Sequence, residues 1–385
     1  VMDAAWQATA VIEKIATLVD RARRESVPVV WVQHDDEGMP QGSPEWQIVE
    51  RLVPADGEAR VRKQHGDSFE GTDLEDVLDG LTRPFKELPP KHFYDARGSE
   101  LFELICALPE YYPTRAEQEI LTHRSGEIIA LSGARSLHEL GAGTATKTRE
   151  LLDALTAQGR PALYAPLDIS KEVLLEAADR LRTDYPALRV EPAVADFHHL
   201  PPLSGEPGER LLVFLGGTIG NFEEDERSGF LDMVHAALAP GDHLLLGADL
   251  VKDPDRLVAA YDDGAGVTAR FNLNLVDVIT RTTPVTGLSR DDLVHEAAWD
   301  DRASRIEMRL RAVRDITADF TGIGRTWRLA KGEHLRTEIS RKFDLGLLRD
   351  ELTEHGFEPV TSWTDAAGDF SLTLARVAGR DDGTP

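Results

Sequence analysis

The sequence has very little cysteine: Cys106 is the one cysteine among 385 residues. A single thiol cannot form an intramolecular disulfide and is typical of a reducing compartment, so we expect a cytoplasmic protein. It also excludes a zinc site built from several cysteines. The 12 histidines show no HExxH spacing, and we therefore expect no metal ion.

Positive charge and long hydrophobic runs are also scarce. Lys and Arg total 43 against 68 Asp and Glu, which gives a formal net charge of −25. Nucleic acids and anionic membranes carry the same sign and would be repelled. No run approaches the roughly 18 apolar residues of a membrane-spanning helix, and no signal-like segment opens the chain. We expect a small-molecule substrate, no nucleic-acid or membrane partner, and an oligomeric state that the sequence leaves open.

Hydrophobic residues make up 41% of the chain, enough for a substantial core, and the length suggests two or three domains. From about residue 81, apolar strand-like runs alternate with amphipathic stretches such as 171–182 and 224–238. This alternation predicts an α/β fold with βαβ units and a parallel, Rossmann-like sheet. The expected strands are residues 136–140, 163–168, 189–194, 211–215 and 243–250.

Residues from about 267 to 343 break this rhythm. In residues 304–313, apolar side chains recur at every second position, which is typical of a half-buried strand. We therefore predict a β-rich accessory domain inserted before the last part of the core. The expected core is about 117–250 and 344–380, with an accessory substrate domain at about 81–116 and 251–343.

Residues 1–80 differ in pattern from the rest of the chain. Residues 10–24 have a helical apolar rhythm, residues 29–32 form a strand-like run, and a helix is expected to begin at Thr72. The stretches PVVWVQHDDEGMPQGSPEWQ and VRKQHGDSFEGTDLEDVL resemble the isochorismatase-like cysteine hydrolases. Lys63 matches that family's lysine, but its first-strand Asp and its nucleophilic Cys have no counterpart here. Without the thiolate the hydrolysis cannot run, so we expect a partial, non-catalytic segment.

The segment HELGAGT marks a strand that ends in a glycine turn at Gly141, with Lys147 following. Glycines allow a ligand to approach the backbone closely, and such turns bind nicotinamide dinucleotides as well as S-adenosylmethionine. The full GxGxxG pattern is not met, because Thr146 stands where the pattern has its third glycine. An ordinary turn between a strand and a helix is the alternative.

Aspartates follow the next two strands. Asp168 ends the strand at 163–168, where a carboxylate can accept hydrogen bonds from both hydroxyls of a ribose. Asp196 and Phe197 follow the strand after it, where they could pair with an adenine amine and stack on its ring. Each aspartate alone could instead be a helix cap. The run LLVFLGGTIGN then places glycines and Asn221 at the end of a further strand, where a substrate can lie against the backbone.

The region 88–377 resembles the ergothioneine-pathway histidine-specific methyltransferases. The similar stretches include LPPKHFYDARGSELFELICALPEYYPTRAEQEIL, HELGAGTATKT, LLVFLGGTIGNF, LLLGADLVKD, AYDDGAGVTARFN, TEISRKF and WTDAAGDFSLTLA. The resemblance implies a class I methyltransferase core that uses S-adenosyl-L-methionine to methylate the α-amine of L-histidine, up to trimethylhistidine (hercynine). It implies cofactor contacts at Gly141, Lys147, Asp168, Asp196 and Phe197, and histidine contacts at Tyr111, Asn221, Tyr261, Glu338 and Ser340.

Such a reaction needs little acid–base chemistry. An α-amine titrates near pH 7.7–8.0 in peptides and somewhat higher in a free amino acid, so deprotonation costs little. Orientation alone can supply roughly 7–11 kcal/mol. We therefore expect no catalytic group beyond the residues that position the substrate, Tyr111 and Asn221.

Glu338 and Ser340 carry the expected substrate specificity. They lie two apart in an expected strand at 336–343, so they share one face. A carboxylate and a hydroxyl on that face could bind both nitrogens of an imidazole ring. An exposed polar face is the alternative, since Arg336 and Lys342 share it.

Three other functions remain open from the sequence. The same reaction could act on another amino acid, such as a tryptophan derivative, although a bulky apolar substrate would not need Glu338. A nicotinamide-dependent dehydrogenase could use the glycine turn, but the third glycine is missing. A non-catalytic binding module is the third, suggested by the partial hydrolase-like segment.

Overall fold

The computed structural model describes residues 8–24, 29–34, 51–55, 59–63, 86–88, 93, 95–195, 200–282, 285–320 and 325–378. The chain divides into two compact units. One unit comprises Val1–Asp95, Asn272–His295 and Leu310–Thr337, and the other comprises Ala96–Phe271, Glu296–Arg309 and Glu338–Pro385.

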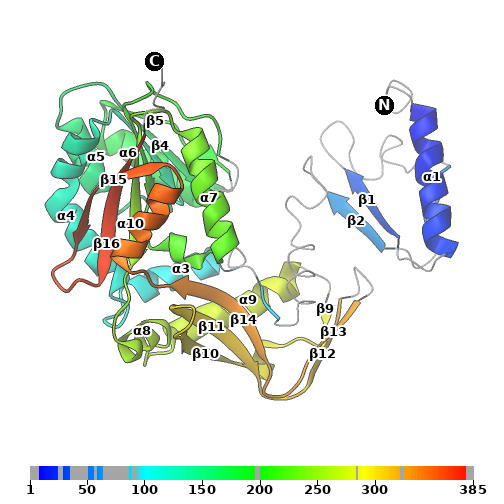
Figure 1. Ribbon diagram of the computed structural model, residues 1–385. Helices are drawn as coiled ribbons and strands as arrows, with labels where there is room; N and C mark the ends of the chain where they lie inside the picture. Colours follow the sequence, from blue (N-terminus) through cyan, green and yellow to red (C-terminus); the bar gives the residue numbers. More distant parts are fainter. Residues whose placement is uncertain are drawn as a thin grey trace. The chain divides into compact units, whose positions relative to one another are not determined.

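A sheet of eight strands forms the centre of the second unit, in the order β15-β16-β8-β7-β3-β4-β5, with β6 paired to β4 (Figure 1). The strands are β3 (Ser136–Leu140), β4 (Ala162–Asp168), β5 (Leu188–Val190), β6 (Ala193–Val194), β7 (Arg210–Phe214), β8 (His243–Asp249), β15 (Phe357–Thr364) and β16 (Phe370–Val377). The strands from β3 to β8 pair in parallel, and β15 and β16 are antiparallel. The predicted α/β fold is confirmed, although the expected strand at 189–194 is divided into β5 and β6.

Helices cover both faces of this sheet (Figure 1). Side chains of α4 (Pro113–Ser132), α5 (Arg149–Thr156) and α6 (Lys171–Asp184) share one buried cluster with Leu211 and Val213. Side chains of α7 (Glu224–Ala237) and α10 (Leu345–Glu354) share the other with Leu212 and Phe214. Alternate residues of β7 thus point into opposite cores, which explains why its sequence is apolar throughout. Across the described residues, the helices include none with the length and apolar character needed to span a membrane.

The region expected to be β-rich begins with a helix. Residues Val267–Thr282 form α9, in which Phe271, Leu275 and Ile279 are buried at helical spacing. Two three-stranded sheets follow, in the orders β13-β12-β9 and β10-β11-β14. Their strands are β9 (Val285–Thr286), β10 (Leu293–Asp300), β11 (Arg305–Ala312), β12 (Ile316–Phe320), β13 (Arg325–Leu329) and β14 (His334–Arg341). The β-rich part therefore exists, but it starts some residues later than the sequence suggested.

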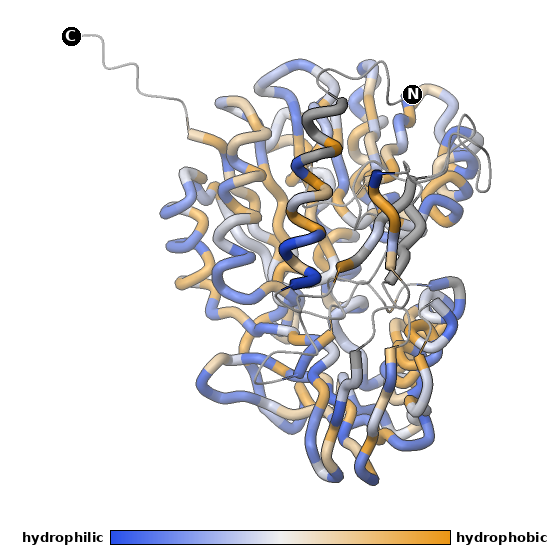
Figure 2. The backbone as a smooth tube through the Cα atoms, turned by 90° about the vertical axis from the view of Figure 1, so that its right-hand side faces the viewer, coloured by the Kyte–Doolittle hydropathy of each residue, from blue (hydrophilic) through white to orange (hydrophobic). Residues whose placement is uncertain are grey.

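The N-terminal residues contain one helix and a pair of strands. Helix α1 (Ala8–Arg24) and the parallel strands β1 (Val30–His34) and β2 (Ala59–Lys63) confirm the first expected helix and strand. Ala16, Trp31 and Leu52 form a small buried cluster. Where the tube of α1 is coloured by hydropathy, it alternates between hydrophobic and hydrophilic colours, as an amphipathic helix does (Figure 2). The helix expected from Thr72 lies outside the described residues.

Candidate active site

The glycine turn lies at the carboxyl end of β3, the central strand that pairs with β4 on one side and β7 on the other. Gly141 and Gly143 have φ angles of 69° and 51°, in the left-handed region that other residues enter at a cost. The amide of Gly141 donates to Leu167 O at 2.9 Å, which ties the turn to the end of β4. Ligands of open α/β sheets bind at this edge, where the strand order reverses.

Asp168 ends β4 beside this turn. Its Oδ2 accepts the amide of Gly143 at 2.8 Å, and its Oδ1 accepts the amide of Ser170 at 2.8 Å. The residue is half-buried, and each carboxylate oxygen keeps a lone pair for a further donor. The structure therefore brings Gly141 and Asp168 together at one sheet edge. The predicted residues Asp196 and Phe197 lie outside the described residues.

Lys147 contacts an acidic partner that the sequence analysis missed. Its Nζ forms an ion pair with Glu117 of α4, whose side chain is 1% exposed. Glu117 also accepts the amide of Gly216, which follows β7, at 2.7 Å. Burial acts to lower the pKa of Lys147, but Glu117 outweighs it and the pKa is raised. A glutamate within an amphipathic helix is usually exposed, so no sequence signal marked Glu117.

A second buried glutamate supports the turn from within the core. Glu139, on β3, accepts a hydrogen bond from Thr148 at 2.6 Å and another from the hydroxyl of Tyr164. Burial raises the pKa of Glu139 to about 7, although both hydrogen bonds oppose the shift. This carboxylate therefore joins β3 to β4 and to the residue that precedes α5.

Asn221 and Glu338 meet although they lie far apart in the sequence. Asn221 ends a short 3-10 helix, η4 (Thr218–Asn221), and its Nδ2 donates to Glu338 Oε1 of β14 at 3.1 Å. Gly220 permits this approach, because a Cβ atom there would lie 2.7 Å from Arg341 O. Burial raises the pKa of Glu338 to about 7, and Lys342 opposes the shift.

Tyr261, at the end of α8 (Pro254–Tyr261), lies beside Ser340. Its hydroxyl and Ser340 Oγ are 2.8 Å apart. The ring of Tyr111 packs edge-on against the ring of Tyr261, with centroids 6.0 Å apart and an interplanar angle of 73°. Glu338 and Ser340 thus point to one side of β14, as period two predicts, and each meets another of the predicted substrate residues.

Lys342 continues this face of β14 and is the second feature that the sequence analysis missed. Its side chain is fully buried, so the exposed face suggested as an alternative is wrong for this residue. Its Nζ lies 2.7 Å from Ser340 Oγ, 2.9 Å from the hydroxyl of Tyr261 and 2.7 Å from Asp249 Oδ2. Burial acts to lower the pKa of Lys342, but Asp249 and the hydroxyl of Tyr261 outweigh it and raise the pKa, so the ammonium is charged at neutral pH.

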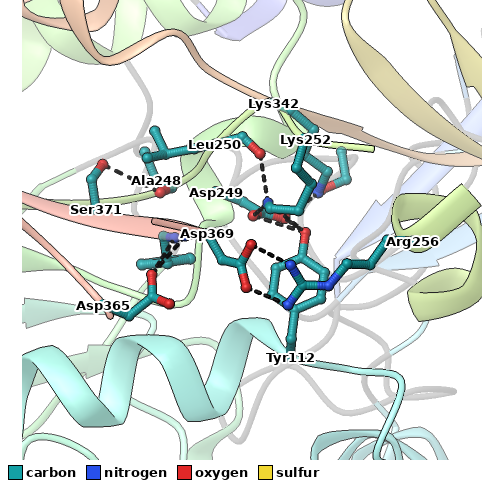
Figure 3. Close-up of polar contacts among 12 residues, drawn as sticks. Tyr112, Ala248, Asp249, Leu250, Lys252, Arg256, Lys342, Asp365, Asp369 and Ser371 are labelled. Carbon is teal, nitrogen blue, oxygen red and sulfur yellow. Dashed lines mark hydrogen bonds and ion pairs between the residues drawn. The ribbon is translucent and has the colours of Figure 1, made fainter. Parts of the chain in front are cut away.

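Asp249 is the centre of a wider polar network (Figure 3). Besides Lys342, it contacts Lys252 Nζ at 2.5 Å and the hydroxyl of Tyr112 at 2.8 and 2.9 Å. Burial alone would raise the pKa of Asp249, but the two lysines lower it. The amide of Phe343 donates to Asp249 O at 2.8 Å, so the chain after β14 runs along the end of β8. This backbone pairing places Lys342 beside the carboxylate.

A carboxylate–guanidinium pair lies beside this network (Figure 3). Arg256 of α8 binds both oxygens of Asp369 in a bidentate ion pair. The amide of Asp369 donates in turn to Asp365 Oδ1 at 2.8 Å. Helix α8, which carries Tyr261, is therefore held to the loop before β16. Within the part of the chain that the structure describes, no group of three or more His, Cys, Asp or Glu could hold a metal ion.

These features define an α/β protein with a candidate ligand site at the carboxyl edge of its parallel strands, and comparison with known families identifies the family. Residues 73–377 match the model of the histidine-specific, S-adenosylmethionine-dependent methyltransferases, and the chain belongs to this family. It is an S-adenosylmethionine-dependent N-methyltransferase. Residues 1–84 match the isochorismatase domain model, in agreement with the resemblance of the N-terminal stretches.

Three relatives illustrate the range of the similarity. The chain is 46% identical over 310 residues to a histidine N-alpha-methyltransferase of Mycolicibacterium smegmatis, covering 78% of this chain and 93% of that protein. It is 29% identical over 289 residues to ergothioneine biosynthesis protein 1 of Neurospora crassa, covering 72% of this chain and 32% of that protein. It is 32% identical over 202 residues to a 4-dimethylallyltryptophan N-methyltransferase of Claviceps purpurea, covering 49% of this chain and 58% of that protein.

Proposed function

We propose that the protein transfers methyl groups from S-adenosyl-L-methionine to the α-amine of L-histidine, up to trimethylhistidine (hercynine), in ergothioneine biosynthesis. The observation that carries this proposal is the placement of Glu338 and Ser340 on one side of β14, with Asn221 and Tyr261 against them. The names of the relatives in Mycolicibacterium and Neurospora support the same substrate.

The two ends of the site have different tasks in this proposal. The cofactor would be held by Gly141, Lys147, Asp168, Asp196 and Phe197, and histidine by Tyr111, Asn221, Tyr261, Glu338 and Ser340. The glycine turn offers backbone at close range, and Asp168 keeps lone pairs for ribose hydroxyls. Lys147 is already paired with Glu117, so it would share its charge between that carboxylate and the cofactor.

The protein's own contribution to the chemistry is positioning. The cofactor supplies an electrophilic methyl group, and the acceptor must be a neutral amine with its lone pair aimed at that group. Asn221 and the hydroxyls of Tyr111 and Tyr261 can hold the amine and the carboxylate of the substrate by hydrogen bonds. Aromatic rings also tolerate the cationic nitrogen that forms as methyl groups accumulate. No base stronger than the solvent is needed, because the amine loses its proton at mildly alkaline pH.

Glu338 gives the site its preference for an imidazole. Asn221 satisfies one oxygen of its carboxylate and leaves the other for a ring N–H. A buried carboxylate without a donor is costly, so a substrate with an apolar ring would be penalised. A tryptophan derivative, the substrate class in the name of the Claviceps relative, would leave part of Glu338 unpaired. Histidine is therefore favoured over that alternative.

The domain assignment forms part of the proposal. The core would comprise about residues 117–250 and 344–380, and the accessory substrate domain about 81–116 and 251–343. Residues 1–80 would be a non-catalytic segment: Lys63 ends β2, but the sequence contains no cysteine before Cys106. A hydrolase of the isochorismatase type needs that nucleophile.

One incubation tests the proposed function. The full chain is mixed with S-adenosyl-L-methionine and all common amino acids, and mass spectrometry identifies which amino acid gains methyl groups and how many. We expect histidine to gain up to three. Methylation of another amino acid alone would overturn the specificity, and methylation of histidine that stops after one group would overturn the assignment of hercynine.

A further inference from the structure

The ammonium group of Lys342 has three N–H donors, and the structure gives each of them an acceptor. The acceptors are Asp249 Oδ2 at 2.7 Å, Ser340 Oγ at 2.7 Å and the hydroxyl oxygen of Tyr261 at 2.9 Å. A lysine can only donate hydrogen bonds, so both hydroxyl oxygens must act as acceptors toward it. The direction of these hydrogen bonds is therefore set by the chemistry of the ammonium group.

The remaining hydrogen bond joins the two hydroxyls of Tyr261 and Ser340, 2.8 Å apart. A phenol is a stronger acid than an aliphatic alcohol, so Tyr261 is the better donor of the pair. Ser340 Oγ then accepts from both Lys342 and Tyr261, which fills its two lone pairs. Its own proton must point elsewhere, toward the side of β14 that it shares with Glu338.

We propose that Lys342 is a positioning residue that makes the Ser340 hydroxyl a hydrogen-bond donor, so that the site selects histidine with a neutral imidazole ring. One ring nitrogen accepts from Ser340, and the other donates its N–H to Glu338. Alternate strand residues are about 6.6 Å apart, a span that an imidazole ring with a hydrogen bond at each end can bridge. This inference rests on the proposed function, in which Glu338 and Ser340 contact the substrate ring.

The protonated ring would fit this arrangement poorly. An imidazolium has a donor on each nitrogen, and one of them would face a serine oxygen whose lone pairs are occupied. The charges that face the cluster are the cations of Lys342 and Lys252 and the carboxylates of Asp249 and Glu338. Asp249 is engaged by both lysines and by Tyr112, so it offers little attraction to a third cation.

Proton counting in a binding experiment tests the inference. The ligand is trimethylhistidine, because its α-nitrogen carries no proton and the imidazole is its one group that titrates near neutrality. Binding to the full chain, saturated with S-adenosylhomocysteine, is measured by calorimetry at pH 8.5 in two buffers of different ionisation enthalpy. At this pH the free imidazole and Glu338 are both almost fully deprotonated. We expect uptake of fewer than about 0.2 protons per site.

Uptake close to one proton would mean that the ring binds as an imidazolium or that Glu338 becomes a neutral carboxyl that donates to the ring, and either result would overturn the inference while leaving the proposed function intact. If neither histidine nor its trimethylated form binds, the proposed function itself fails. The two failures are therefore distinguishable in one set of titrations.

Lys342→Met tests the role of the Lys342 ammonium group, and Lys252→Met is its matched control. Both lysines contact Asp249, but Lys342 alone of the two also contacts Ser340 and Tyr261. We expect the Lys342→Met protein to bind the ligand more weakly and with clearly larger proton uptake, because a serine lone pair is freed. The Lys252→Met protein should keep the proton count of the wild type. A folded Lys342→Met protein with the proton uptake of the wild type would contradict the role of Lys342. If the variant does not fold, the proton uptake measured for the wild-type protein alone decides whether the neutral ring is selected.

Discussion

Strand β3, which leads into the glycine turn, and the cluster at the end of β14 (Glu338, Ser340 and Lys342) each contain a glutamate whose pKa is raised by burial to about 7. Glu139 is 4% exposed, and hydroxyls of Thr148 and Tyr164 donate to its two oxygens. Glu338 is only half-buried, and Asn221 donates to one of its oxygens. A raised pKa therefore reports burial in both places. The hydrogen-bond partners separate a carboxylate that joins core elements from one that can receive a ligand.

Replacing Glu338 should give the largest effect and is the clearest test of the difference between Glu338 and Glu139. A hydrogen bond to a charged group contributes about 1.5–3 kcal/mol, so Glu338→Ala should weaken histidine binding by roughly 10- to 100-fold. Cofactor binding should change by less than about threefold, because in the proposed site this carboxylate contacts the substrate and not the cofactor. Calorimetric titration with each ligand measures both effects, and equal losses for the two ligands would show that Glu338 is structural, as Glu139 is.

The next effect concerns the close approach of η4 to β14. A Cβ atom on Gly220 would lie 2.7 Å from Arg341 O, so Gly220→Ala should lower the free energy of unfolding by about 1–3 kcal/mol and weaken histidine binding. Gly126 is the control, because it lies on α4 with open space around its Cβ position. Gly126→Ala should be neutral or stabilise the protein by about 0.5–1 kcal/mol. Denaturant unfolding compares them, and a harmless Gly220→Ala would contradict the packing described for Asn221.

Asp168→Asn tests the proposed cofactor site beside the glycine turn. The amide cannot accept at both positions, so one of the hydrogen bonds from Gly143 and Ser170 is lost, together with the charge toward the ribose. We expect about tenfold weaker cofactor binding, with histidine binding nearly unchanged once the cofactor saturates the protein. Asp179→Asn, on the exposed side of α6, should leave both affinities as they are. Unchanged cofactor affinity in Asp168→Asn would remove Asp168 from the cofactor site.

The smallest effect is a pH dependence of stability. The pKa of Glu139 is about 7 in the folded state and near 4.5 in the unfolded chain. The folded state therefore keeps this carboxyl protonated to higher pH. The folded state therefore binds more protons between these pKa values, and stability falls as the pH rises through this window. Between pH 6 and 7 the contribution of Glu139 to this fall should amount to about 1 kcal/mol, and Glu139→Gln should remove that part of the slope and leave the similar contribution of Glu338. Unfolding by denaturant at each pH measures the slope, and an identical slope in the variant would show that Glu139 is not the titrating group.

The elements that depend on local sequence were the predictable part of this molecule. The apolar runs are buried on both faces of the sheet, so their lengths and order predict β3, β4, β7 and β8 almost to the residue. The glycines of the turn need positive φ angles, which the HELGAGT pattern already suggests. Helix α9 was missed, because its neighbourhood has the strand-like alternation that dominates the residues after it.

The site was predictable only where one strand carries its residues. Period two places Glu338 and Ser340 on one side of β14, and the same rule places Lys342 there. Whether that lysine is exposed depends on Asp249, which a different strand supplies, so the strand pattern alone could not decide it. Asp249 itself had a signal, since it ends a strand as Asp168 does. Glu117 and Tyr112 had none, because their partners come from distant parts of the chain.

Selection of the imidazole ring is the property that most directly tests the role of the cluster at the end of β14. Initial rates of methylation are measured for L-histidine and for 2-thienylalanine, whose five-membered ring has a similar shape but no ring nitrogen. Sites built around buried polar groups reject analogues that leave those groups unpaired, so kcat/KM should favour histidine by at least about 1000-fold. Comparable values for the two substrates would contradict the assignment of Glu338 and Ser340 to the imidazole.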